Sequence, residues 1–453
     1  MKFTNGFWLV RDEFQADYVR DIYEVEEREN ELLAFAPYKQ IQGRGDTLNI
    51  GMMTYTFTAP AKDILGIHMV NHAGNYVKSP SFELYGDLDK SPERKCEKAS
   101  GKEKWTLKSG KLSLEFETGS PGMKFYGDGR ELTCIKSKTT GMMHHKQGMN
   151  YLVSGLNLGV GELVYGLGER FTPMVKNGQT VDIWNEDGGT ASEISYKNIP
   201  FYYTTKGYGV FVNHPGRVSF EVGSEKVETV QFSVEDEELE YFVIYGPTPL
   251  EIIEKYTALT GRPALPPKWS FGLWLTTSFT TNYDEATVNS FIDGFEQRHI
   301  PLSVFHFDCF WMKGFEWCNF TWDKDMFPDP AGMLERFHKR GLKICVWINP
   351  YIAQKSPLFG EAMEKGYLLM KDNGRVWQWD MWQAGMGLVD FTNPDACSWY
   401  QSKLKALLDV GVDCFKTDFG ERVPTNVKWF DGSDPEKMHN YYTYLYNQCV
   451  FEL

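Results

Sequence analysis

Apolar and polar residues alternate in short runs from residue 1 to about residue 245, and the runs end at Gly, Asn, Asp or Pro. Residues 112–117, 209–212 and 230–234 are examples of this alternation. A period of two with frequent turn residues is typical of antiparallel sheets. We therefore predict an N-terminal antiparallel β-sandwich over residues 1–245.

The pattern changes at Pro247-Thr248-Pro249, where apolar residues begin to recur with a helical spacing. A proline-rich linker over residues 261–267 follows, and from there apolar strands alternate with amphipathic helices. One predicted helix contains the apolar residues Val288 to Phe295. Three more are predicted to begin at Asp-Pro or Asn-Pro pairs, at residues 329–330, 393–394 and 434–435. An Asp or Asn cap followed by Pro suits the start of a helix. The predicted strands are residues 269–275, 303–308, 343–349 and 413–418.

Strands that alternate with helices indicate a parallel α/β barrel. The alternation stops at the fourth strand, whereas a closed (β/α)8 barrel has eight. The fold class that we predict is therefore multidomain β plus α/β: the sandwich, followed over residues 246–453 by the first half of a (β/α)8 barrel. On this basis we expect the chain to be a fragment, or a half that pairs with something else.

One insertion interrupts the barrel pattern near residues 367–385. Residues 367–371 and 376–380 flank Asp372-Asn373-Gly374, which is a hairpin turn signal. The insertion lies between the third strand and its return helix, on the side where a barrel site forms. Two interpretations stay open, a structural flap and a segment that shapes the substrate site.

Composition excludes several function classes. The net charge of −14 argues against nucleic acid and anionic membranes as partners. No apolar run is long enough to span a membrane, and no secretory signal follows Met1. The eight cysteines are scattered without a C-x-x-C pair, which favours reduced thiols and a cytoplasmic location. The sequence leaves open whether the chain forms a homo-oligomer.

Acidic residues end two of the predicted barrel strands. Asp308 closes the second strand, and Asp418 closes the fourth, with Lys416 two residues earlier and Glu421 three residues later. Residues i and i+2 of a strand share a face, so Lys416 lies beside Asp418 and favours its charged form. Catalytic groups of barrel enzymes collect at such strand ends. A buried ion pair between Lys416 and Asp418 is the structural alternative.

Other motifs do not support a different chemistry. His144 and His145 are adjacent, so they cannot both face one metal from a strand. His68 and His72 lack the helical context and the acid of a metalloprotease motif. Gly166-Leu167-Gly168 is not followed by the third glycine of a dinucleotide loop. We therefore predict no metal and no cofactor.

Four stretches resemble the bacterial α-xylosidases of glycoside hydrolase family 31: residues 164–171, 184–190, 305–311 and 416–421. The resemblance extends over almost the whole chain, and Lys416-Thr417-Asp418-Phe419-Gly420-Glu421 with Cys309-Phe310 looks like the xylosidase subgroup. It implies a sandwich, a (β/α)8 barrel and C-terminal β domains. It also implies a retaining glycosidase that releases non-reducing α-linked xylose from xyloglucan-type oligosaccharides.

The resemblance implies roles for individual residues. Asp418 would be the nucleophile, and Asp187 would reach the barrel mouth from a sandwich loop. Asp308 and Lys416 would bind sugar hydroxyls or orient the nucleophile. The residues that would form the wall of the xylose subsite are Phe279, Cys309, Phe310 and Trp347. A bulky wall is a way to exclude a hydroxymethyl group, because an overfilled pocket costs about 1–3 kcal/mol.

The general acid/base of the family lies on a later barrel segment, and we expect it beyond Leu453. Retaining chemistry needs two carboxyl groups about 5 Å apart. Glu421 is kept as a second catalytic candidate because it lies near Asp418, but proximity alone does not assign it the acid role. The alternatives to an α-xylosidase are a catalytically incomplete sugar-binding remnant and an α-glucosidase of the same family.

Overall fold

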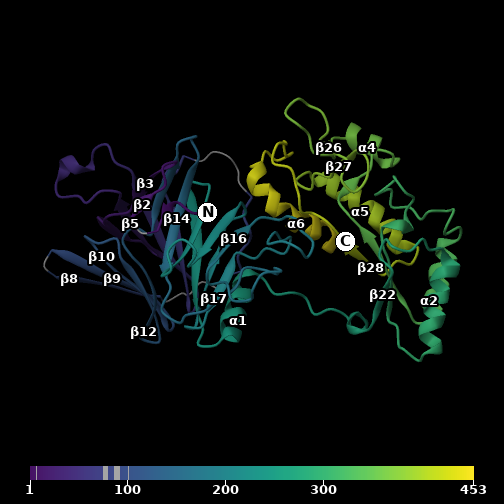
Figure 1. The fold of residues 1–453 in the computed structure, drawn as a ribbon, viewed down its shortest axis with the longest axis horizontal. Coiled ribbons are helices and arrows are strands. Elements are labelled where there is room, and N and C mark those ends of the chain that lie inside the picture. Colours follow the sequence, from purple (N-terminus) through teal and green to yellow (C-terminus); the bar gives the residue numbers. More distant parts are fainter. Residues whose placement is uncertain (7, 75–79, 86–91, 100) are drawn as a thin grey trace. The chain divides into compact units, whose positions relative to one another are not determined.

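The computed structural model describes residues 1–6, 8–74, 80–85, 92–99 and 101–453. Two compact units make up the chain, and the division between them falls after Arg262. The first unit is drawn in purple to teal and the second in green to yellow (Figure 1). Each unit is described by itself below.

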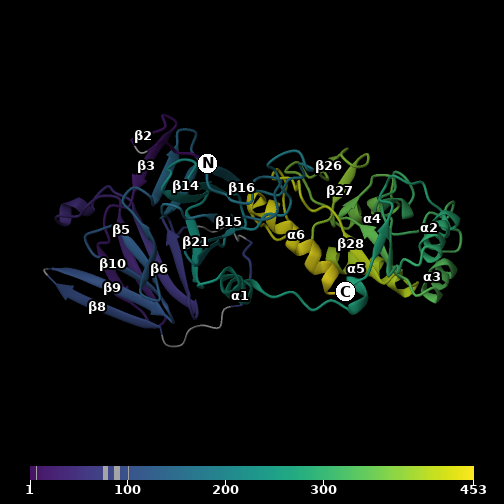
Figure 2. The ribbon, with the colours of Figure 1, turned by 60° about the horizontal axis from the view of Figure 1, so that its bottom comes forward.

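The first unit consists of antiparallel sheets (Figures 1 and 2). The largest has the order β15-β17-β18-β21-β7-β6-β5-β4, with bounds β4 Glu24–Glu27, β5 Glu31–Pro37, β6 Met52–Ala61, β7 Ile64–Val70, β15 Val164–Gly166, β17 Phe201–Thr204, β18 Tyr208–Val212 and β21 Glu238–Tyr245. The second has the order β16-β19-β20-β14-β13-β3, with bounds β3 Phe14–Tyr18, β13 Gly141–His145, β14 Asn150–Asn157, β16 Gln179–Ile183, β19 Val218–Val222 and β20 Thr229–Val234.

Two smaller sheets complete this unit. One has the order β12-β11-β10-β9-β8, with bounds β8 Glu93–Ala99, β9 Lys102–Ser109, β10 Leu112–Glu117, β11 Met123–Gly127 and β12 Arg130–Ile135. The other pairs β1 (Thr4–Asn5) with β2 (Leu9–Val10). A short 3-10 helix spans Arg44–Thr47. The antiparallel sandwich predicted from the alternation is confirmed.

One face of the eight-stranded sheet packs against both the five-stranded sheet and the six-stranded sheet. Phe57 and Tyr241 both pair with Ile67 in register, so all three side chains point to the same side. Phe57 contacts Phe116 of β10 with ring centroids 5.0 Å apart, and Tyr241 contacts Phe232 of β20 at the same centroid distance. Burial of these apolar faces is the main stabilising term for the unit.

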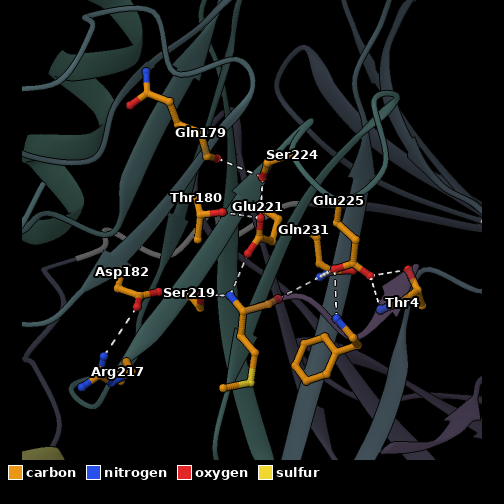
Figure 3. A network of polar contacts seen from close by, with 12 residues as sticks. Thr4, Gln179, Thr180, Asp182, Arg217, Ser219, Glu221, Ser224, Glu225 and Gln231 are labelled. Carbon is orange, nitrogen blue, oxygen red and sulfur yellow. Dashed lines mark hydrogen bonds and ion pairs between the residues drawn. The ribbon is translucent and has the colours of Figure 1, made fainter. Parts of the chain in front are cut away.

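Carboxylates attach the first residues of the chain to the strands β19 and β20 (Figure 3). The carboxylate of Glu225 accepts hydrogen bonds from the Thr4 N–H at 2.8 Å and from Nε2 of Gln231 at 2.6 Å. Buried Glu221 lies 2.9 Å from the amino group of Met1 and accepts a 2.7 Å bond from Thr180. Hydrogen-bonded partners offset the cost of burying such charges.

The helix α1 (Pro249–Thr260) packs on the sandwich. Thr248 caps it by accepting a bond from the Glu251 N–H, and Ile252 and Leu259 are buried. Tyr256 stacks on Phe201 of β17 with ring centroids 4.0 Å apart. The first compact unit therefore continues through Arg262, whereas the boundary drawn from the sequence falls after residue 245.

The second unit is built on a parallel sheet with the order β22-β23-β24-β28. The bounds of its strands and helices are β22 Trp274–Thr276, α2 Glu285–Gln297, β23 Val304–Phe307, α3 Pro330–Lys339, β24 Lys343–Ile348, α4 Leu358–Glu364, α5 Pro394–Asp409, β28 Cys414–Thr417 and α6 Pro435–Phe451. Asp329, Asn393 and Asp434 cap α3, α5 and α6 with their side chains. The strand–helix alternation predicted for this half is confirmed.

Two local details of this unit differ from the prediction. The first strand begins at Trp274 and not at Trp269, because residues Lys268–Phe271 form a 3-10 helix after the proline-rich linker. The helix α4 was not predicted, because its 7 residues are too few to show a helical spacing of apolar positions. Within the described ranges, no helix combines the length and the apolar character needed to cross a bilayer.

Residues 367–385 turn where the sequence predicts, at Asp372-Asn373-Gly374, and Met370 and Val376 flank the turn as an isolated antiparallel bridge. The Gly374 N–H donates to Lys371 O at 2.9 Å, and Gly374 has a φ of +75°, which glycine adopts without steric cost. The chain then forms the strands β26 (Gln378–Trp379) and β27 (Met386–Leu388). The strand β27 pairs with both β26 and β25 (Tyr351–Ile352), so the insertion is joined to the segment that follows β24.

Candidate active site

The register of the parallel sheet places polar side chains in two successive rows. His306 pairs with Thr276 on one side and with Cys345 on the other, and Cys345 pairs with Cys414. Two residues further along the strands, Trp347 pairs with Lys416. Because residues i and i+2 share a face, the second row lies above the first at the carboxyl ends of the strands. Asp308 directly follows β23 at that end.

Asp308 is a buried carboxylate with contacts on both oxygens. Its Oδ1 accepts a bond from the Cys309 N–H at 2.9 Å. Its Oδ2 lies 3.5 Å from Nζ of Lys416 and 4.0 Å from Nδ1 of His306. Its carbonyl oxygen accepts a 3.1 Å bond from the hydroxyl of Tyr283. A buried carboxylate needs such partners to stay charged.

Asp418 lies at the end of β28, where its backbone N–H donates to Ile348 O at 2.9 Å. The Oδ2 of Asp418 accepts a 2.5 Å hydrogen bond from Nε1 of Trp347 and lies 3.5 Å from Nζ of Lys416. Its side chain is partly exposed, so the carboxylate is accessible from one side. This partial exposure distinguishes the pair of Lys416 and Asp418 from a fully buried ion pair.

Lys416 is shared by the two carboxylates, because its Nζ is 3.5 Å from an oxygen of each. A cation between two carboxylates offsets their mutual repulsion. Two negative groups can therefore lie close together at the end of the sheet.

His306 lies in the row beneath these charges. Its Nδ1 is 2.8 Å from Oγ1 of Thr276. Burial lowers the pKa of His306 to about 4, and the charge of Lys416 acts in the same direction, while Asp308 opposes them. Burial and the neighbouring Asp308 raise the pKa of the Cys309 thiol well above its usual range. At neutral pH both side chains are therefore uncharged.

Aromatic rings pack around Trp347, whose indole donates to Asp418. Trp347 is 1% exposed and contacts Trp317 and Phe419 edge to face, with centroid distances of 4.9 Å and 5.7 Å. Phe419 stacks on Trp382 of the hairpin insertion at 4.3 Å. Phe310 is exposed and contacts Trp317 at 6.0 Å. Apolar walls with a few oriented polar groups are characteristic of small-molecule sites.

Family models match both units. The model of the glycosyl hydrolases family 31 TIM-barrel domain matches residues 263–453, and that of the glycosyl hydrolase 31 N-terminal galactose mutarotase-like domain matches residues 54–221. The chain belongs to glycoside hydrolase family 31.

Relatives with assigned names agree with the family. The family 31 chain is 55% identical to the α-xylosidase XylQ of Lactiplantibacillus pentosus over 100% of its own length and 59% of that protein. It is 49% identical to an α-xylosidase of Emericella nidulans, of which it covers 60%. The chain thus spans less than two thirds of the length of these curated relatives.

Solved structures support the fold. The family 31 dextranase of Flavobacterium johnsoniae, complexed with glucose, superposes with a TM-score of 0.83 at 23% identity over 96% of this chain and 53% of that one. At this identity the likeness concerns the fold alone.

The structure brings together several of the residues that the sequence predicts for the site. Asp308, Cys309, Lys416, Trp347 and Asp418 lie at adjoining strand ends. Phe310 follows Cys309 in a 3-10 helix that Asp308 caps. The register of the sheet does not place the other predicted residues. These are Phe279, Glu421 and Asp187.

Phe279 lies on the loop after β22 with its ring exposed. Glu421 is buried, and its carbonyl oxygen accepts a 3.3 Å bond from the hydroxyl of Tyr351. The catalytic role predicted for Glu421 and the wall role predicted for Phe279 stay predictions.

Asp187 belongs to a loop of the sandwich unit, where its Oδ1 accepts a bond from the Gly189 N–H at 2.9 Å. Arg170 braces this loop by donating to Glu193 O at 3.0 Å and Asp182 O at 2.7 Å. Burial lowers the pKa of Arg170 to about 10, so its guanidinium stays charged at neutral pH. The loop therefore has a fixed shape within its unit, and the role of Asp187 stays a prediction.

Four residues around the carboxylates were not predicted as site residues. His306 could have been found, because it lies two positions before Asp308 in the predicted strand 303–308 and so shares its face. Phe419 directly follows Asp418. Trp317 and Trp382 give no local signal, because Trp317 lies on the long loop before α3 and Trp382 on the hairpin insertion. Among the described residues, no group of three His, Cys, Asp or Glu side chains is arranged to hold a metal ion.

Proposed function

We propose that this chain carries the nucleophile and most of the xylose pocket of a retaining α-xylosidase. The observation that carries the proposal is the Asp418 carboxylate, which is oriented by the Trp347 indole and held beside Lys416. The similarity to two α-xylosidases at 55% and 49% identity supports the choice of substrate.

In the proposed reaction, one oxygen of Asp418 attacks the anomeric carbon of a terminal α-linked xylose. The bond from that carbon to the leaving oxygen breaks, and a covalent xylosyl-enzyme forms while a carboxylic acid protonates the leaving oxygen. The acid that gave up its proton, now a carboxylate, then removes a proton from water as the water oxygen attacks the anomeric carbon. The bond from that carbon to Asp418 breaks, which releases xylose and frees Asp418. The resemblance to the family implies that this acid/base lies on a later barrel segment than β28.

The remaining pocket residues support recognition of xylose. Asp308 and Lys416 are placed to hydrogen-bond sugar hydroxyls, and Asp187 is proposed to contribute from the sandwich loop. We further propose that Cys309, Phe310 and Phe279 wall the pocket where a hexose would carry its hydroxymethyl group. The proposed substrates are xyloglucan-type oligosaccharides with non-reducing terminal xylose.

The first experiment compares hydrolysis of an aryl α-xyloside and an aryl α-glucoside by the purified protein. Faster hydrolysis of the xyloside supports the proposal, and faster hydrolysis of the glucoside favours the α-glucosidase alternative. Binding of xylose without hydrolysis favours a catalytically incomplete sugar-binding protein.

The second experiment tests the nucleophile. A fluorinated xylosyl fluoride reacts with a retaining enzyme to leave a long-lived covalent adduct, which peptide mass spectrometry locates. We expect the adduct on Asp418 and no turnover by Asp418→Ala. Unchanged turnover by this variant contradicts the role.

We also propose a cytoplasmic location, which the eight free cysteines support. Localisation of a tagged chain by cell fractionation tests it, and recovery outside the cell contradicts it.

A further inference from the structure

The tip of the hairpin insertion is held in one shape beside the carboxylates. The Gly385 N–H donates to Oδ1 of Asp380 at 3.0 Å, and Nε2 of Gln378 donates to Gly385 O at 2.6 Å. The Trp317 N–H donates to Oε1 of buried Gln383 at 3.0 Å, which ties the tip to the aromatic wall around Trp347. The tip is therefore ordered before any ligand binds.

A file of aromatic rings leads from the nucleophile to this tip. Trp347, which donates to Asp418, meets Phe419 edge to face with an interplanar angle of 89°. Phe419 then stacks on Trp382 with ring centroids 4.3 Å apart and an angle of 19°. Exposure rises along the file, from 1% at Trp347 to 38% at Trp382. The file thus has a buried end at the nucleophile and an exposed end on the hairpin.

We propose that Trp382 is a stacking platform for the sugar unit to which the terminal xylose is attached. The proposal rests on the proposed function, and it assigns the hairpin insertion a part in substrate selection. The ligand chemistry is a pyranose ring, such as the glucose of a xylosyl-glucose disaccharide, whose C–H face lies on the indole.

The order of the file supports this assignment. An enzyme that removes a terminal sugar places that sugar at the nucleophile, which is the buried end beside Trp347. The next sugar then lies further out, where the exposed ring is that of Trp382. Removing the C–H face of a sugar and an indole face from water is favourable, because both are apolar surfaces. One face of Trp382 is already occupied by Phe419, so the indole plane is fixed in advance and little rotamer entropy is lost on binding.

The test compares two substrates that share the xylose and differ in what is attached to it. One is an α-1,6-linked xylosyl-glucose disaccharide, and the other is α-xylosyl fluoride, which has no second ring. For Trp382→Ala we expect kcat/KM on the disaccharide to fall about 10-fold, equivalent to ~1.4 kcal/mol. On the fluoride we expect a change of less than about 2-fold. Trp382→Phe, which keeps an aromatic face, is expected to restore most of the loss on the disaccharide.

The matched control is Met381→Ala, because Met381 is the neighbouring residue of the tip and is 42% exposed. It is expected to leave both substrates unchanged. An equal loss on both substrates with Trp382→Ala overturns the proposal and places the indole in the xylose pocket. No loss on the disaccharide, or an equal loss with Met381→Ala, also overturns it.

The outcome for the platform can be separated from the outcome for the proposed function. A wild-type protein that hydrolyses neither substrate, and that forms no covalent adduct on Asp418 with the fluorinated xylosyl fluoride, contradicts the function. In that case, calorimetric titration with xylose and with the disaccharide tests the platform directly. Weaker binding of the disaccharide alone by Trp382→Ala supports the platform, and equal binding to the wild type overturns it.

Discussion

Nε1 of Trp347 donates a 2.5 Å hydrogen bond to Oδ2 of Asp418. The donor is on β24 and the acceptor at the end of β28, so two neighbouring parallel strands fix the direction of the carboxylate. Hydrogen bonds to ionised acceptors are shorter and stronger than neutral ones. The indole is buried and packed against two other rings, so it cannot turn away without disturbing them.

Replacing this donor tests its contribution to catalysis. Trp347→Phe keeps an aromatic ring and removes the N–H. Because a hydrogen bond to a charged group contributes about 1.5–3 kcal/mol, we expect kcat/KM on an aryl α-xyloside to fall about 10- to 100-fold. Steady-state kinetics measure the loss, and circular dichroism checks the fold. Kinetics equal to those of the wild type would show that the bond has no catalytic effect.

Removing the charge of Lys416 tests the shared cation. In Lys416→Met, the carboxylates of Asp308 and Asp418 lose the ammonium group that lies 3.5 Å from each, and their mutual repulsion is no longer offset. We expect kcat/KM to fall about 100-fold. The matched control is Lys428→Met, which removes an exposed ion pair with Asp372 and is expected to be nearly neutral. Equal effects of the two substitutions would contradict the assigned role.

The buried His306 predicts a pH dependence of stability. Its folded pKa is lowered to about 4, mainly by burial, whereas an unfolded histidine titrates near ~6.5. Between these values the unfolded chain binds the extra proton, so stability falls as the pH falls through this window, by up to ~3 kcal/mol. We expect His306→Asn to lose less stability than the wild type between pH 7 and pH 4.5.

Urea unfolding at several pH values, followed by tryptophan fluorescence, measures this difference. The matched control is His299→Asn, because His299 is exposed and its backbone φ of +53° suits asparagine. The control is expected to follow the wild type. A pH dependence of His306→Asn that equals that of the wild type would refute the prediction.

Glu421 can be tested as a second catalytic carboxyl. Its side chain is buried and it follows Asp418 by three residues, so we expect Glu421→Gln to lower the melting temperature and to change kcat by less than about 10-fold. An acid/base behaves differently, because its loss slows substrates with poor leaving groups far more than activated ones. Kinetics on xylosides with leaving groups of different acidity measure this. A strong dependence on the leaving group in the variant would identify Glu421 as the acid/base.

The parts of the structure that the sequence predicts well depend on local signals. Asp329, Asn393 and Asp434 precede prolines and cap helices, as expected from neighbouring residues alone. Asp308, Lys416 and Asp418 were found because strand ends and a spacing of two can be read from the chain. Their common location then follows from parallel strands, whose carboxyl ends meet at one edge.

The parts that were missed depend on contacts between distant segments. Trp382 meets Phe419 only because the hairpin insertion folds back on the sheet. The helix α1 joins the sandwich because Tyr256 stacks on Phe201, which no pattern within the helix indicates. The role of Asp187 stays a prediction.

The attachment of Thr4 by Glu225 joins positions 221 residues apart in the chain (Figure 3). During synthesis, the first strands leave the ribosome long before their anchoring carboxylate exists. Likewise, one edge of β7 stays unpaired until β21, which begins at Glu238, has been synthesised. Non-local pairing of this kind makes folding slow, and unpaired edges stay exposed to aggregation meanwhile. A chaperone would therefore have most unpaired strand edge to protect while the nascent chain is still shorter than this span.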